Sequence, residues 1–172
     1  MTEPDLELGE GESILAVSDD LIYRQITKHL LAPNGAIATH AFVDSDEPSY
    51  TQSTIVTAQE SRDWHTKHSK SPSLQVRAVT VREVVQSECL VIDDTKAPLE
   101  ADEIRAPGHC YVDARKLDRV TLKSLRAILW NLANGRGEIP TKEPLEDGEL
   151  DLTAVSDGTA KTNEKAPDGS GS

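Results

Sequence analysis

The chain of 172 residues has few aromatic side chains, only two cysteines and no long apolar run. No segment approaches the roughly 20 apolar residues that a membrane-spanning helix needs. The N-terminus also lacks the basic and then apolar order of a secretory signal. The sequence therefore predicts a soluble, cytoplasmic protein. Because two thiols in a chain of this length need no disulfide framework, we expect Cys89 and Cys110 to be reduced and buried.

Several sequence motifs of enzymes and metalloproteins are absent as well. The chain contains no G-x-S-x-G, no H-E-x-x-H and no C-x-x-C, so a serine or cysteine nucleophile and the common zinc sites have no support. His65 and His68 would share one face of a helix and could reach a metal with His40, His109 or Cys110 as remote ligands. Surface histidines in a charged helix explain the spacing more simply. We therefore expect no metal centre and no cofactor.

The acidic residues of the chain are concentrated at its ends. The net charge is −12, yet residues 13–137 alone have a net charge of −1. Residues 1–12 contain five acids and no base, and residues 138–172 contain nine acids and three lysines. Such segments have too little apolar surface to offset the entropy of ordering. The sequence predicts a disordered acidic head over 1–12, one domain over 13–137, and a disordered acidic tail over 138–172.

Within the domain, apolar periodicity and turn signals indicate the secondary structure. Ser18 and an apolar stripe at spacing four predict a helix that Pro33-Asn34-Gly35 ends; the alternative is a strand that begins at Leu21. Residues 36–43 are apolar and free of glycine and proline, which predicts a strand. Residues 58–68 indicate a charged helix, and 74–81 a strand that contains a bulge or passes into a helix. Residues 90–92 and 109–113 indicate further strands.

The clearest element is a helix from about Asp118 to Asn134, followed by the helix-ending Gly135. Its apolar stripe is formed by Leu122, Leu125, Ile128, Leu129 and Leu132. This stripe needs a partner, and the preceding strands supply one. The sequence thus predicts an α+β fold, with a small mixed or antiparallel sheet packed by a C-terminal amphipathic helix.

Two segments are candidates for binding a partner protein. A basic stripe lies on and before the C-terminal helix, at Arg115, Lys116, Arg119, Lys123 and Arg126. Without interleaved aromatic residues, and in an acidic chain, this stripe does not favour nucleic acid. The second segment lies in the tail, where Leu145, Leu150 and Leu152 stand among acids as in short linear binding segments. The stripe can also be a solvated face or a dock for the tail itself, and the tail can be merely solubilising.

Two catalytic alternatives remain open. The order Arg24, Ser53-Thr54, Gln86-Ser87-Glu88 is similar to the Arg–Ser–Glu class of ADP-ribosyltransferases. That likeness implies that Arg24 holds a nicotinamide dinucleotide, Ser53 shapes its pocket and Glu88 stabilises an oxocarbenium charge. The intervals are shorter than that class has, and aromatic residues for stacking are scarce. A nuclease is the other alternative, with Asp93, Asp94 and Glu83 as metal-binding carboxylates.

A further resemblance concerns about residues 22–130. It rests on Tyr23-Arg24-Gln25, Gly35, His40-Ala41-Phe42, Val79-Thr80-Val81 and Gly108-His109. These residues resemble a small, functionally uncharacterised bacterial family with the pattern Y-R-Q, G, A-F and H-A. The chain departs from that pattern where Cys110 follows His109 in place of alanine. The resemblance implies a bacterial domain in which Arg24 and His109 share a pocket, and it implies no activity.

The sequence favours a non-catalytic protein-interaction or accessory module of a bacterial cytosolic system. A compact domain with acidic ends and no convincing catalytic motif is typical of such a module. The alternative is an enzyme that acts on a nucleotide or dinucleotide through Arg24, Ser53, Glu88 and His109. The two hypotheses differ in one geometric expectation, because catalysis requires these side chains to meet in one cleft.

Overall fold

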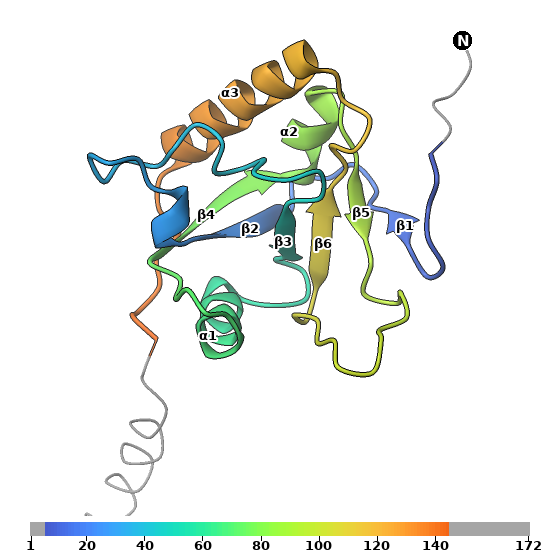
Figure 1. Ribbon diagram of the computed structural model, residues 1–172, viewed down its shortest axis with the longest axis horizontal. Helices are drawn as coiled ribbons and strands as arrows, with labels where there is room; N and C mark the ends of the chain where they lie inside the picture. Colours follow the sequence, from blue (N-terminus) through green and yellow to red (C-terminus); the bar gives the residue numbers. More distant parts are fainter. Residues whose placement is uncertain (1–5, 145–172) are drawn as a thin grey trace, which may run out of the picture.

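The computed structural model describes residues 6–144. They form an α+β domain built on one antiparallel sheet of six strands (Figure 1). The strands in spatial order are β1 (Ser13–Ile14), β5 (Val91–Asp93), β6 (His109–Val112), β3 (Ser49–Gln52), β2 (Leu21–Ile26) and β4 (Gln75–Thr80). The predicted fold class is confirmed, and the sheet is antiparallel throughout the described residues.

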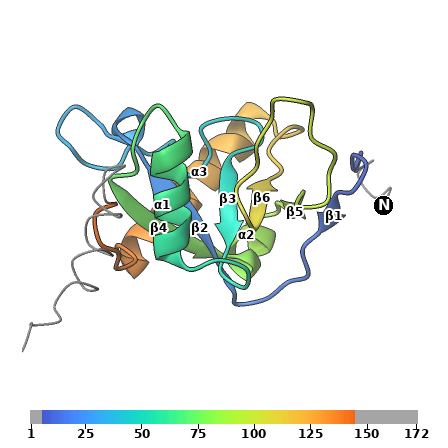
Figure 2. The ribbon, with the colours of Figure 1, turned by 90° about the horizontal axis from the view of Figure 1, so that it is seen from below.

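Helices cover the two faces of this sheet. The long helix α3 (Arg119–Arg136) packs on one face, and α1 (Ala58–His68) lies against β2 and β4 on the other, as the two views show (Figures 1 and 2). The short helix α2 (Val81–Gln86) continues directly from β4, which confirms the predicted passage from strand to helix. A single 3-10 turn, Lys28–Leu30, follows β2.

The hydrophobic core lies between the sheet and α3. Leu125, Leu129 and Ala133 of α3 are buried against strand residues and against Phe42 of the β2–β3 connection. The apolar stripe predicted for this helix is therefore correct at Leu125 and Leu129, but it includes residues that are not buried. Ile128 and Leu132 keep 42% and 36% of their surface exposed, because the buried side of α3 continues through Ala133 instead.

The helix expected from Ser18 is wrong, and the alternative of a strand that begins at Leu21 is right. Residues Leu21–Ile26 form β2, in which alternate residues, Ile22, Arg24 and Ile26, are buried. A spacing of four places two residues on one face of a helix, but it also places them on one face of a strand, whose side chains repeat every two residues. Two isoleucines four apart therefore fit both structures.

The strand expected over 36–43 is also wrong. This segment consists of turns, apart from a single bridge between Ile37 and Leu31. Several of its carbonyl groups accept hydrogen bonds from side chains instead of from a neighbouring strand, and buried carbonyls need such partners. Arg24 Nε donates to Ala41 O, the Tyr50 hydroxyl to Phe42 O and Arg126 Nε to Val43 O.

The described chain extends past both predicted domain boundaries. At the N-terminal end, the Tyr111 hydroxyl donates to the carboxylate of Glu12 over 2.9 Å. At the C-terminal end, Ile139 pairs with Val76 of β4. Residues 6–12 and 138–144, which the sequence placed in the head and the tail, thus lie against the domain. Residues 1–5 and 145–172 lie outside the described part.

Both cysteines are free and buried, as predicted. Burial raises the pKa of the Cys89 thiol to about 11, and burial likewise raises the pKa of Cys110. The two thiols are therefore neutral at physiological pH. Within residues 6–144, no helix has the length and apolar character needed to cross a membrane.

Candidate functional site

Arg24, the first predicted catalytic residue, is a buried side chain at the centre of β2. Its Nε and Nη1 donate to Ala41 O and Ser49 O, each over 2.9 Å, and Nη2 lies 2.7 Å from Asp44 Oδ1. The guanidinium also lies over the ring of Tyr50, 5.6 Å from its centroid. Three of its five N–H donors are thus used to hold the β2–β3 connection in place.

His109 lies on the opposite face of the sheet from Arg24. It is the cross-strand partner of Thr51, which in turn is the partner of Tyr23. Cross-strand partners share a face, and consecutive strand residues point to opposite faces. His109 Nδ1 instead meets Asp94 Oδ1 over 2.7 Å, and Arg105 flanks the same carboxylate.

The other two predicted catalytic residues lie elsewhere. Ser53 follows β3, and its amide donates to Leu21 O. Glu88 is exposed just after α2, where its φ of 66° places it in the left-handed region that ends helices. The structure does not bring Arg24, Ser53, Glu88 and His109 into one cleft, because Arg24 and His109 lie on opposite faces of the sheet. The ADP-ribosyltransferase-type alternative therefore has no geometric support here.

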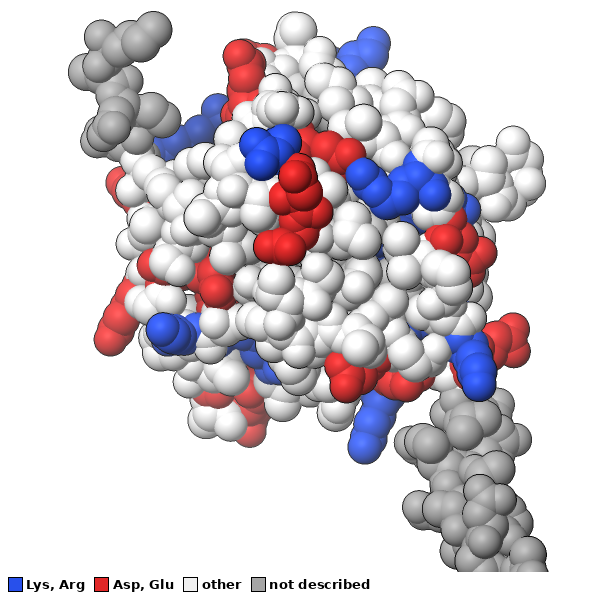
Figure 3. Space-filling view, turned by 180° about the vertical axis from the view of Figure 1, so that it is seen from behind, with Lys and Arg blue, Asp and Glu red and all other residues white. Residues whose placement is uncertain are grey.

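The five residues of the basic stripe fall into two groups, two that contact the rest of the domain and three that are exposed. Arg126 donates to Val43 O, and Arg115 pairs with Asp113 and approaches Glu47, so both side chains serve the fold. Lys116, Arg119 and Lys123 are exposed. On the face that Figure 3 shows, basic side chains are scattered among acidic ones and do not gather into one patch. The predicted partner-binding residues Leu145, Leu150 and Leu152 lie outside the described residues.

The histidines and carboxylates that were candidates for a metal site or a nuclease site make other contacts in the structure. His65 Nε2 meets Ser71 O, and the ring of His68 packs on Trp64. Asp93 accepts from Thr95, and Glu83 caps α2 and pairs with Arg136. Within residues 6–144, no three His, Cys, Asp or Glu side chains are grouped so as to hold a metal ion.

A groove of about 1410 Å³ follows α1 and is lined by residues from both flanks of this helix. A capping box fixes the start of this helix, because Thr57 Oγ1 accepts from the Glu60 amide while the Glu60 carboxylate accepts from the Thr57 amide. Underneath, Ser61 bonds to Thr51 and Gln25 of the sheet. The helix is therefore held rigidly at its end and along its buried side.

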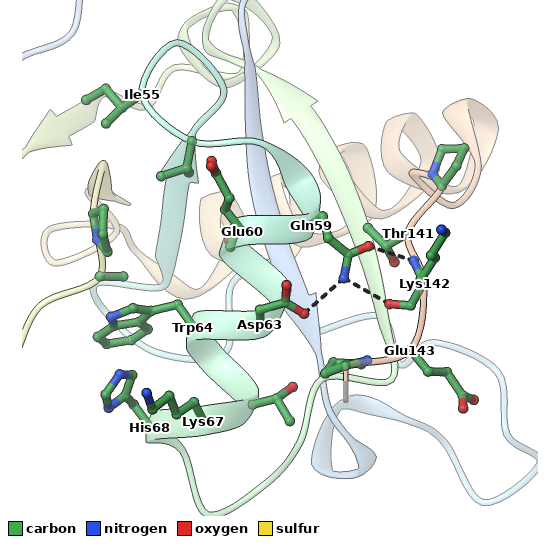
Figure 4. Close-up of a pocket in the computed structure, with 17 residues that line it drawn as sticks. Ile55, Gln59, Glu60, Asp63, Trp64, Lys67, His68, Thr141, Lys142 and Glu143 are labelled. Carbon is green, nitrogen blue, oxygen red and sulfur yellow. Dashed lines mark hydrogen bonds between the residues drawn. The ribbon is translucent and has the colours of Figure 1, made fainter. Parts of the chain in front are cut away.

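One flank of α1 binds the end of the described chain as an extended segment. The Gln59 side-chain amide pairs with both backbone groups of Lys142, over 2.7 and 3.0 Å. Arg62, buried to 5% exposure, donates to Thr141 Oγ1 and Lys142 O. Figure 4 shows Gln59 reaching from the helix to this segment. Most of these contacts are made to backbone atoms of the segment. The way α1 holds the segment therefore depends little on the segment's own sequence.

The other flank of α1 is apolar and open. Trp64 and His68 lie side by side there, with ring centroids 4.6 Å apart, and Ile55 lies on the same side of the helix (Figure 4). Ile55 is 52% exposed. Gly108 has a φ of 72°, and a Cβ there would lie 3.0 Å from Ile55 Cβ. This glycine therefore lets the loop that carries Pro107 approach Ile55 and close the far wall of the groove.

Among the residues that shape this groove, only His68 and Gly108 were noted from the sequence, His68 as a possible metal ligand and Gly108 as part of a resemblance. The capping pattern Thr57-x-x-Glu60 and the lone tryptophan in a charged helix were available signals. Gln59 and Arg62 left no signal, because their partners lie about 80 positions away in the sequence.

Comparison with models of protein families, with curated proteins and with solved structures finds no match for this chain.

Proposed function

We propose that this chain is a non-catalytic protein-interaction module of a bacterial cytosolic system, and that α1 is its binding surface. One observation carries the proposal. The helix holds Thr141 and Lys142 in extended form on one flank, while Ile55, Trp64 and His68 leave an open, largely apolar surface on its other flank. A helix that already binds one extended chain through backbone contacts is suited to bind a second one beside it.

The chemistry of the groove indicates an extended partner segment with an apolar side chain next to an acidic one. Ile55 and Trp64 offer the apolar side chain a place to be buried. Lys67 lies near the C-terminal end of α1, where its ammonium group attracts a negative charge. The acids of the same helix are already engaged, since Glu60 binds the Thr57 amide and Asp63 binds Gln59.

The test measures fluorescence anisotropy of a labelled synthetic peptide in which leucines alternate with acids. A matched peptide carries lysines in place of the acids. We expect the acidic peptide to bind and the basic one to bind at least about tenfold more weakly. Trp64→Ala and Ile55→Ser in the full chain are expected to weaken binding by a similar factor, because each removes buried apolar contact area.

The matched control is Ile104→Ser, since Ile104 is another exposed isoleucine (62%) and does not line the groove. Equal losses for Ile55→Ser and Ile104→Ser, or equal affinity for both peptides, would overturn the proposal. A chain that ends after Pro144 separates a partner from the chain's own leucine-containing segment. Unchanged affinity supports a partner, whereas tighter binding assigns the groove to that segment and overturns the partner assignment.

A further inference from the structure

A second concave site lies near the C-terminal end of α1, where β2 continues past the first residue of β3. It has a volume of about 340 Å³, within the range of small-molecule sites. Its walls come from β2, the β2–β3 connection and the C-terminal part of α1, and include Tyr23, Arg24, Thr27, Asp44 and His65. None of the residues lining this cavity also lines the groove along α1.

The charges of this cavity are paired with each other. Arg24 and Asp44 form an ion pair of 2.7 Å, with side-chain exposures of 8% and 34%. The cavity therefore presents a carboxylate to solvent and keeps the guanidinium beneath it. Asp44 Oδ1 faces Arg24, and Oδ2 accepts no hydrogen bond from the described residues. The exposed carboxylate repels an anionic ligand, and its pairing with Arg24 weakens its attraction for a cationic one.

His65, Tyr23 and Thr27 supply further hydrogen-bonding groups to the cavity. Because a carbonyl only accepts, His65 Nε2 carries the hydrogen that it shares with Ser71 O, which leaves Nδ1 as an acceptor. Burial, with a contribution from Arg24, lowers the pKa of His65, so this tautomer persists at neutral pH. The hydroxyls of Tyr23 and Thr27 bond to no other described residue. The cavity thus offers two acceptors of hydrogen bonds and two hydroxyls.

We propose that this cavity binds a neutral ligand with vicinal hydroxyl groups, either a ribonucleoside or a monosaccharide. Adjacent hydroxyls supply the donors that Asp44 Oδ2 and His65 Nδ1 need, and their oxygens accept from Tyr23 and Thr27. The apolar C–H face of a sugar can pack on the half-buried ring of Tyr23. The inference is independent of the interaction function proposed for the groove.

The test is a titration of the full, isotope-labelled chain followed by backbone amide NMR. The probes are ribose, glucose, adenosine and 2′-deoxyadenosine. We expect saturable shifts confined to residues 23–29, 44–50 and 65–71. Adenosine at least about tenfold tighter than glucose identifies a nucleoside site, and the reverse order identifies a carbohydrate site. Both orders support the proposal, provided that 2′-deoxyadenosine binds more weakly than adenosine.

Two variants locate the ligand, and one serves as control. Asp44→Asn is expected to weaken binding at least about tenfold. Because that change also loosens Arg24, Thr27→Val provides a second variant that leaves the ion pair intact and is expected to weaken binding as well. Tyr111→Phe removes a phenol that bonds to Glu12, outside the cavity, and should change nothing. No shifts with any probe, equal binding of adenosine and its 2′-deoxy form, or stronger binding of inorganic phosphate would overturn the inference.

Discussion

Arg24 shows how one side chain decides the conformation of a long connection. The guanidinium occupies a position in β2 between two buried isoleucines. It replaces apolar packing there with bonds to Ala41 O and Ser49 O and a pair with Asp44. Burial of a charge is tolerated only where such partners compensate for lost hydration. The sequence alone predicts a catalytic Arg24, whereas its contacts show a structural residue that also lines a cavity.

Replacement of Arg24 by alanine is expected to lower the free energy of unfolding by about 3–5 kcal/mol, because it leaves Asp44 unpaired and buried carbonyls without a donor. Urea unfolding followed by circular dichroism measures the change. Arg82→Ala is the matched control. Its ion pair with Asp19 has side chains 45% and 80% exposed, so the expected loss is about 0–1 kcal/mol. Equal losses for both variants would contradict the structural role of Arg24.

Glu88 adopts a backbone conformation that lowers the stability of the folded protein. It is the only non-glycine residue with positive φ in the described chain, and this conformation costs a side-chain-bearing residue about 1 kcal/mol. We expect Glu88→Gly to raise the free energy of unfolding by about 0.5–1 kcal/mol. Glu100→Gly, at an exposed position with negative φ, should instead lower it slightly. A loss of stability in Glu88→Gly would show that its carboxylate makes a contribution that the structure does not account for.

At the scale of elements, the sequence predicts best where one period alone fits. The predicted helix over 58–68 has the bounds of α1, and the helix from Asp118 differs from α3 only at its ends. Prediction failed at β2, where a spacing of four fits both periods, and over 36–43, where side chains distant in sequence bind the carbonyls. The groove was not predicted, for the same reason as the conformation of residues 36–43, because its contacts join residues that are distant in the sequence. Gln59 and Arg62 act on a segment about 80 residues away, and no local pattern encodes that contact.

The segment after α3 offers a test of this long-range contact. A chain that ends after Gly137 loses the bonds of Gln59 and Arg62 to residues 141 and 142 and the pairing of Ile139 with Val76. We expect the free energy of unfolding to fall by about 1–3 kcal/mol relative to the chain that ends after Pro144, at about 1 kcal/mol or less per hydrogen bond. Thermal and urea unfolding of the two truncated chains measure the difference. Identical stability would show that α1 does not depend on this segment.

In the whole molecule, α1 connects the two concave surfaces. Trp64 and His68 face the apolar groove, and His65 lines the polar cavity. The helix rests on a buried polar network in which Ser61 bonds to both Thr51 and Gln25, and Ser73 bonds to Gln25. Such a fully bonded layer fixes orientation more strongly than an apolar contact does. Both surfaces are therefore built from one rigid element, and a change that tilts α1 would alter both.

His65 makes this arrangement sensitive to acid. Since its pKa is lowered in the folded protein, the unfolded chain binds a proton at a pH where the folded chain does not. The contribution of neutral His65 to the free energy of unfolding is therefore fully present above the unfolded pKa of about 6.5, and it falls as the pH drops below that value. Glu83, Asp93 and Asp113 also have lowered pKa values, but their contributions are lost only below about pH 4.5.

We expect urea unfolding between about pH 7 and pH 5 to show a decline in the free energy of unfolding that is smaller in His65→Gln. Glutamine does not titrate, and its amide can still donate to Ser71 O, the present partner of His65 Nε2. His29→Gln replaces an exposed histidine and should keep the slope of the unaltered protein. Equal slopes in His65→Gln and the unaltered protein would mean that the acid sensitivity arises elsewhere. A smaller slope would mean that protonation of the half-buried His65 ring loosens the element that carries both binding surfaces.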